Sequence, residues 1–362
     1  MKMTFRWFGE NSDSVTLSQI KQIPGVSGLM GFLDYKAAGE VWTTGEIAAY
    51  MDKVKAAGLE CEVIESVNVH EDIKLGLPTR DRYIENYCQT IRNLAAFGVK
   101  VIIYNFMPVI DWLRTDLHRL DPRDGSYSMY YDDSLVAGRS PLDFVGSMAA
   151  GSRGFSLPGW EPERMAELKS TLALYADMTQ EKLLENFGYF MRGILPTLTE
   201  TGIKMSCHPD DPSWPIFGLP RIGYNAYWLG RMLDAVDSPY NTLCLCTGSL
   251  GSNPENDVPA MIRRFGARDR ISCLHIRNIE FLGEGVFREC AHESPHGALD
   301  LFEIVRAAVE TCPEVYVRPD HGRMIWGEEG RPGYGLYDRA IGTAYINGLW
   351  EAVSRLSAAD QA

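Results

Sequence analysis

The sequence predicts an α/β protein of the (β/α)8 TIM-barrel class, with a long insertion in the fourth βα loop. Eight segments carry the residue pattern of a strand, and a helical pattern follows each of them. Several of these strands are apolar almost throughout, which is typical of parallel strands covered on both faces. The 362 residues contain no recognisable linker, so we expect one barrel domain over residues 1–362.

The first half of the chain contributes four predicted strands. They cover residues 3–8, 25–32, 60–67 and 99–106, and the helices between them cover 15–23, 43–57 and about 84–94. Thr43 and Glu46 have the three-residue spacing of a capping box at the start of the second helix. In the third helix, apolar side chains from Ile84 to Leu94 recur with the helical period, which indicates a buried stripe.

Residues 107–178 interrupt the regular alternation. This stretch is rich in Asp, Tyr, Gly, Ser and Pro, and it contains many aromatic side chains. Long segments without a regular pattern are functional covers or disordered segments, and the aromatic content favours an ordered cover. We therefore expect an insertion or lid within the barrel domain.

The regular pattern resumes with a helix over 179–200. Four strands follow at 203–208, 241–248, 271–278 and 315–321, with helices at 226–236, 258–265, 298–311 and 336–356. Strand alternation places polar side chains on one face of these strands and apolar side chains on the other. The apolar face suits packing against helices, so the polar face is predicted to line the barrel interior.

Each of these four strands ends in a residue type that binds metals. The residues are His208, Cys246, His275 and Asp320, separated by steps of 38, 29 and 45 residues. Neighbouring parallel strands deliver their carboxyl ends to the same rim, so we expect the four side chains to share one metal site. Taken singly, each has a structural explanation as a core or capping residue. Two imidazoles, a thiolate and a carboxylate suit zinc first, with iron or manganese next.

Further polar residues lie near the predicted site. Arg6 and Asn105 stand near the ends of the first and fourth strands, and Arg277 and Asn278 closely follow His275. We expect these four to bind substrate, because an arginine at such a rim suits a carboxylate, although a loop salt bridge is an equal alternative. His321 and Tyr334 follow the last strand, where a histidine and a tyrosine beside a Lewis acid can divide acid and base roles.

Charge and cysteine content limit the class of protein. The net charge of −13 and the pI near 5.1 argue against a nucleic-acid partner. No secretory signal is evident, and no apolar run is long enough to span a bilayer. Eight cysteines are too few for a disulfide scaffold, so a cytoplasmic location is expected.

Six motifs together resemble the D-mannonate dehydratases, a metal-dependent family with a xylose-isomerase-like TIM barrel. The motifs are FRWFGENSD (5–13), CHPDDP (207–212), CTGSLG (246–251), HIRN (275–278), RPDHGR (318–323) and PGYGL (332–336). The likeness runs from the first strand to the last helix and includes the insertion. It implies a hydro-lyase that dehydrates D-mannonate to 2-keto-3-deoxy-D-gluconate in hexuronate catabolism.

The resemblance also implies residue roles and a cofactor. The metal ligands of the family fall on the four residues already named, and its catalytic histidine and tyrosine fall on His321 and Tyr334. The implied ion is Mn²⁺, with Fe²⁺ or Zn²⁺ as replacements. The alternatives are a metal-dependent aldose–ketose isomerase, a non-catalytic barrel that binds sugar acids, and a phosphodiesterase, which the acidic charge disfavours. A homo-oligomer is compatible with the sequence, which leaves the oligomeric state open.

Overall fold

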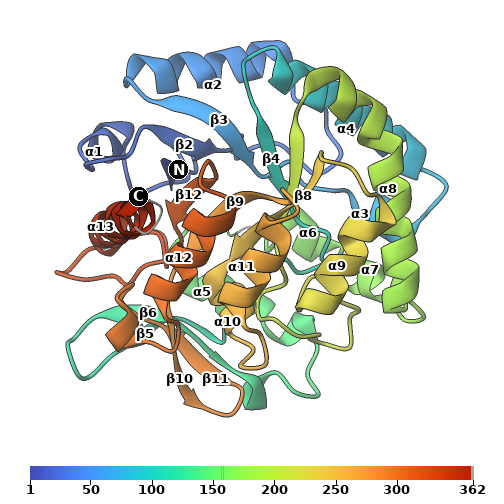
Figure 1. The fold of residues 1–362 in the computed structure, drawn as a ribbon. Coiled ribbons are helices and arrows are strands. Elements are labelled where there is room, and N and C mark those ends of the chain that lie inside the picture. Colours follow the sequence, from blue (N-terminus) through green and yellow to red (C-terminus); the bar gives the residue numbers. More distant parts are fainter. Residues whose placement is uncertain (156, 158, 360–362) are drawn as a thin grey trace.

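A computed structural model describes residues 1–155, 157 and 159–359, and its centre is a closed barrel of eight parallel strands (Figure 1). Around the barrel the strands run in the order β1-β12-β9-β8-β7-β4-β3-β2. Their bounds are β1 Lys2–Arg6, β2 Gly28–Gly31, β3 Glu60–Glu65, β4 Val101–Tyr104, β7 Lys204–Cys207, β8 Asn241–Cys246, β9 Ile271–Ile276 and β12 Tyr316–Pro319. The predicted TIM-barrel class is confirmed.

Helices follow the barrel strands and surround them (Figure 1). Their bounds are α1 Leu17–Lys21, α2 Thr44–Ala56, α4 Arg80–Ala95, α8 Gln180–Thr201, α9 Ala226–Ala235, α11 Val258–Gly266, α12 Leu301–Thr311 and α13 Tyr337–Ala359. The capping box of Thr43 and Glu46 is present at α2. Two one-turn helices, α3 Glu71–Leu75 and α10 Thr247–Gly251, were not predicted.

The predicted division of the strand faces is correct. Cys244 and Cys273 pack inside the barrel with apolar side chains of β2, β3 and β4, including Met30 and Val63. Leu243, Leu245, Leu274 and Ile276, from the opposite faces, belong to the larger core that the helices cover. The alternation of β8 and β9 therefore sends Cys246 and His275 toward the barrel axis.

The insertion contains regular structure that the sequence did not reveal. Its elements are β5 Asp116–Leu120, β6 Tyr127–Asp132, the 3-10 turns η1 Asp133–Leu135 and η2 Pro141–Asp143, α5 Val145–Gly151, α6 Pro162–Ala166 and α7 Leu168–Leu174. After β9 comes an unpredicted hairpin of β10 Ile279–Gly283 and β11 Val286–Glu289. The four strands form one antiparallel sheet in the order β10-β11-β6-β5. Tyr131 and Phe287 pack in a separate core beneath it.

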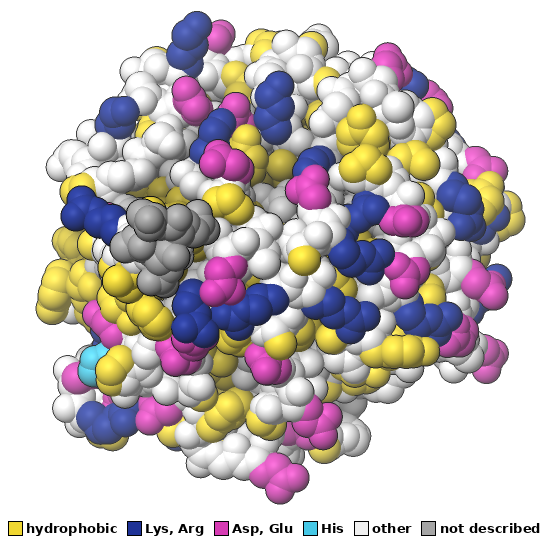
Figure 2. All heavy atoms as spheres, in the orientation of Figure 1, with side chains coloured by type: hydrophobic (Ala, Val, Ile, Leu, Met, Phe, Trp, Pro, Cys, Tyr) yellow, Lys and Arg dark blue, Asp and Glu magenta, His cyan; other side chains and the backbone are white. Residues whose placement is uncertain are grey.

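The surface over α11 and α12 carries both signs of charge. Figure 2 shows Lys and Arg side chains interspersed with Asp and Glu on this face. Arg263 pairs with Glu303 and Glu310, and Arg306 pairs with Glu303. No helix in the described part of the chain combines the length and the apolar composition needed to cross a membrane. All eight cysteines are free thiols.

Candidate active site

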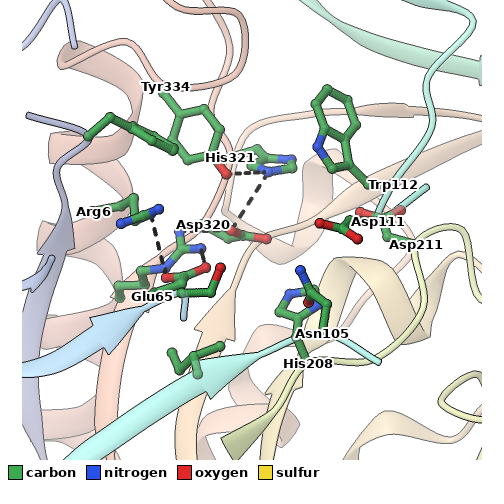
Figure 3. A pocket seen from close by; sticks show the side chains of 14 residues that line it. Arg6, Glu65, Asn105, Asp111, Trp112, His208, Asp211, Asp320, His321 and Tyr334 are labelled. Carbon is green, nitrogen blue, oxygen red and sulfur yellow. Dashed lines mark hydrogen bonds and ion pairs between the residues drawn. The ribbon is translucent and has the colours of Figure 1, made fainter. Parts of the chain in front are cut away.

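A small cavity of about 70 Å³ lies at the carboxyl ends of the barrel strands. Side chains from five of the eight strand ends line it, together with residues of the insertion (Figure 3). Arg6 comes from β1, Glu65 from β3 and Arg318 from β12. This is the face at which TIM-barrel enzymes carry their active sites.

The structure brings the four predicted metal ligands together. The donor atoms of His208, Cys246 and His275 all lie within 4.8 Å of one another. The fourth residue, Asp320, accepts a hydrogen bond from the Cys246 thiol at 3.1 Å, and its Oδ1 lies 3.9 Å from Nδ1 of His275. Four consecutive βα units of the barrel thus supply one cluster of donors.

The chemistry of these donors fits a divalent cation. Nδ1 of His208 donates to the Pro209 carbonyl at 2.8 Å, which leaves the Nε2 lone pair available. Nε2 of His275 is buried and has no hydrogen-bond partner among the described residues. Burial and the neighbouring Asp320 carboxylate raise the pKa of the Cys246 thiol to about 12, so without a cation this ligand keeps its proton. A cation would replace that proton.

Two arginines hold Asp320 in place. Arg318 lies 2.8 Å from Oδ1 of Asp320, and Nε of Arg277 donates to Oδ2 at 2.6 Å. Burial alone would raise the pKa of Asp320, but His321 and these two guanidinium groups hold it well below its usual range. The carboxylate is therefore ionised and ready to act as a ligand.

His321 connects Tyr334 with a carboxylate of the antiparallel sheet. Nε2 of His321 lies 2.9 Å from the Tyr334 hydroxyl, and Nδ1 lies 2.6 Å from Oε1 of Glu289. The cations around Glu289 hold its pKa below the usual range although burial opposes this, so Nδ1 carries the proton and donates to it. Burial raises the pKa of Tyr334, so its hydroxyl keeps its proton and donates to Nε2.

Comparison with known proteins identifies the family. Residues 1–360 match the family model described as D-mannonate dehydratase (UxuA). A mannonate dehydratase of Lachnoclostridium phytofermentans is 60% identical over 357 residues, which cover 99% of this chain and 100% of that protein. The chain belongs to the D-mannonate dehydratase family. It is therefore an enzyme, and its class is hydro-lyase.

Solved structures agree with this assignment to the D-mannonate dehydratase family. The crystal structure of mannonate dehydratase from Streptococcus suis serotype 2 has a TM-score of 0.88 and 43% identity, and the match covers 99% of this chain and 96% of that one. A xylose isomerase domain protein from Planctomyces limnophilus has a TM-score of 0.53 at 11% identity, with 98% of both chains covered. At that identity the second likeness shows the fold alone.

The four predicted substrate-binding residues divide into two pairs in the structure. Arg6 and Asn105 line the cavity. Arg277 and Asn278 are not among the residues that line it, and their contact with substrate stays a prediction. Arg277 is fully buried and bonds to three carboxylates, Asp320, Glu289 and Asp211.

The side chain of Asn278 is also held by hydrogen bonds within the protein. Its amide nitrogen donates to the carbonyls of Glu293 and Leu299 at 3.3 Å each, and its Oδ1 accepts from the Leu299 backbone at 3.0 Å. These bonds fix the loop between β11 and α12. Strand β9 ends at Ile276, two residues earlier than predicted, so Arg277 does not follow the alternation that was used to place it.

Sequence analysis missed a buried network of three residues beside the cavity. Arg114, in the insertion, binds both oxygens of Asp211 at 2.7 and 3.0 Å and Oε1 of Glu289 at 3.0 Å. All three side chains are buried. Asp211 was within reach of sequence reasoning, because it lies three residues after His208 in the CHPDDP motif. No local sequence motif identifies Arg114 or Glu289 as site residues, because their positions in the site depend on the antiparallel sheet.

Proposed function

We propose that this chain is a divalent-metal-dependent D-mannonate dehydratase, which eliminates water from D-mannonate to give 2-keto-3-deoxy-D-gluconate in hexuronate catabolism. One observation carries this proposal: the hydrogen-bonded pair of His321 and Tyr334 faces the same cavity as the donors of His208 and Asp320 (Figure 3). Proton-transfer groups beside a cation site are what a dehydration next to a carboxylate requires. Family membership supplies the substrate.

We assign the cation to the cluster of His208, Cys246, His275 and Asp320. The family resemblance favours Mn²⁺, and the thiolate makes Fe²⁺ and Zn²⁺ acceptable replacements. When bound, a divalent cation stabilises the negative charge that develops on substrate oxygen as the C2 proton leaves. The surrounding arginines keep Asp320 anionic, which suits the same cation.

The chemical step breaks two bonds. A base removes the proton from C2, an acid protonates the hydroxyl that leaves C3 as water, and the resulting enol becomes the 2-keto product. Tyr334 and His321 share these two roles, because the Tyr334 hydroxyl and Nε2 of His321 lie 2.9 Å apart and can pass a proton between them. Glu289 keeps Nδ1 of His321 protonated, so Nε2 is the nitrogen that takes part.

The test is an end-point assay on metal-stripped protein. D-Mannonate is supplied with and without Mn²⁺, and the 2-keto-3-deoxy acid is detected. We expect product only when the ion is present. If no divalent ion restores product although the protein binds it tightly, the dehydratase proposal fails, and neutral aldoses are then screened for isomerisation.

A further inference from the structure

A second cavity, of about 340 Å³, adjoins the first. We call it the outer cavity, and we call the cavity of the metal ligands the inner cavity. Asn105 and Asp111 line both cavities, so the two meet at these side chains. The far wall of the outer cavity is formed by α3 and by α6 and α7 of the insertion, through residues such as Arg164 and Thr171.

The reaction requires more space than the inner cavity provides. Pockets that enclose a small molecule typically measure about 300–1,000 Å³. The inner cavity, at about 70 Å³, is far below this range, whereas the outer cavity is within it. Chemistry at C2 and C3 fixes these atoms beside His321 and Tyr334. Only the carboxyl carbon lies beyond C2, but three hydroxylated carbons lie beyond C3, and this longer arm needs the additional room.

Asn105 is equipped to bind such an arm. Its half-buried side chain has no hydrogen-bond partner among residues 1–155, 157 and 159–359, although it offers two donors and one acceptor oxygen. Asp111 is buried, and its two oxygens are 3.3 Å from the Arg164 guanidinium, so acceptor capacity remains for a hydroxyl. Both side chains turn into the inner cavity (Figure 3), and both also line the outer cavity. An amide and a carboxylate can form hydrogen bonds with hydroxyl groups on adjacent carbons.

The charges of the outer cavity favour a neutral arm. Its carboxylates are Glu71, Asp72, Asp111 and Glu167, and its cations are Lys74 and Arg164. Both cations are already paired, Lys74 with Glu71 at 2.7 Å and Arg164 with Glu71 and Asp111. Acidic groups therefore exceed basic ones and both cations are paired, so the outer cavity suits an uncharged arm. The inner cavity has a similar excess of carboxylates, but the proposed divalent cation would offset it there, which leaves that cavity for the carboxylate end of the substrate.

We infer that the outer cavity is the subsite for the C4–C6 polyol arm of the sugar acid, and that Asn105 and Asp111 bind the first hydroxyls of this arm. The inference rests on the proposed function and extends it to the selection of chain length. The enzyme thus distinguishes a six-carbon aldonate from shorter aldonates of the same configuration at C2 and C3.

The test compares three substrates that share that configuration. D-Mannonate has the full arm, D-lyxonate lacks C6, and L-erythronate lacks C5 and C6. For the unmodified Mn²⁺-loaded protein we expect kcat/KM to fall at each truncation, by about tenfold overall or more. Asn105→Ala should lower kcat/KM about tenfold for D-mannonate and by a smaller factor for L-erythronate, which keeps only the C4 hydroxyl of the arm.

A second variant tests the space itself without altering the inner cavity. Thr171→Trp narrows the outer cavity from α7, and Ala173→Trp, exposed on the same helix and outside the cavity lining, is its control. We expect Thr171→Trp to reduce turnover of D-mannonate far more than that of L-erythronate, and Ala173→Trp to change neither.

The outcomes separate the two proposals. If the unmodified protein turns over D-mannonate and uses L-erythronate equally well, the subsite is refuted and the function stands. If Asn105→Ala and Thr171→Trp each lower turnover of all three acids by the same factor, the subsite is also refuted. If the unmodified protein turns over none of them, the proposed function fails, and the subsite fails with it.

Discussion

Glu289 and His321 form a hydrogen bond of 2.6 Å between Oε1 and Nδ1, on the side of the imidazole that faces away from Tyr334. Glu289 belongs to β11 of the antiparallel sheet, and His321 follows the last barrel strand. The antiparallel sheet and the barrel therefore meet at the proposed catalytic histidine. This contact fixes the tautomer of His321 and the direction in which Nε2 points.

Replacing Glu289 tests this positioning role. Glu289→Gln should lower kcat by about 10- to 100-fold, because the amide no longer holds the protonated Nδ1 as firmly, and KM should change little. The measurement is steady-state turnover of D-mannonate with Mn²⁺ present. Glu280→Gln, on the neighbouring strand β10, removes a carboxylate of the same sheet that contacts Arg123 and Arg288, and it should leave kcat unchanged.

Tyr334 and His321 should be essential for turnover but not for metal binding. Tyr334→Phe keeps the ring that packs edge-on against Phe8 and removes only the hydroxyl, and His321→Asn removes the imidazole. We expect each to reduce turnover by about 10² or more while the Mn²⁺ content stays constant. Full activity in either variant would exclude that residue from proton transfer.

Cys246 should govern the affinity for the cation. Cys246→Ser replaces the thiolate with a weaker ligand, so we expect Mn²⁺ affinity, measured by calorimetry, to fall at least about tenfold and turnover to fall with it. Cys244→Ala is the matched variant, because Cys244 lies on the same strand inside an apolar cluster. If the two variants bind the ion equally well, Cys246 is not a ligand.

The free energy of unfolding should decrease at low pH, partly because Glu62 has a lowered pKa in the folded protein. Partial burial alone would raise the pKa of Glu62, but the Lys2 ammonium and the Tyr316 hydroxyl lower it. A lowered pKa contributes stability above the usual glutamate value of about 4.3, and this contribution disappears as the pH falls through the folded-state value. Glu62→Gln should therefore flatten the acid side of a plot of unfolding free energy against pH, by at most about 1 kcal/mol. An unchanged slope would contradict this assignment.

Strand period and βα spacing were enough to predict the barrel and the convergence of four donor side chains. The alternation in β8 and β9 separates inward from outward residues, so Cys246 and His275 could be placed from local pattern alone. His321 and Tyr334 drew their roles mainly from the family motifs. The end of a strand is harder to predict: the predicted strand 271–278 ends at Ile276, before Arg277.

The antiparallel sheet was beyond sequence reasoning for a physical reason. Tyr131 of β6 pairs with Phe287 of β11, and no local signal relates two short strands so far apart in the chain. Both segments read as loops when considered alone. Glu289 and Arg114, which depend on this pairing for their position, were missed with it.

The pairing of β6 with β11 also has a consequence for the newly made chain. During synthesis, β6 leaves the ribosome long before β11 exists. The edge of β6 that pairs with β11 therefore has no partner strand while α8, β7 and β8 are added. Contacts between such distant segments form late and slow the folding of a domain. We therefore expect a nascent barrel that has most of its strands but no proton-transfer machinery, with catalytic competence as one of the last properties acquired.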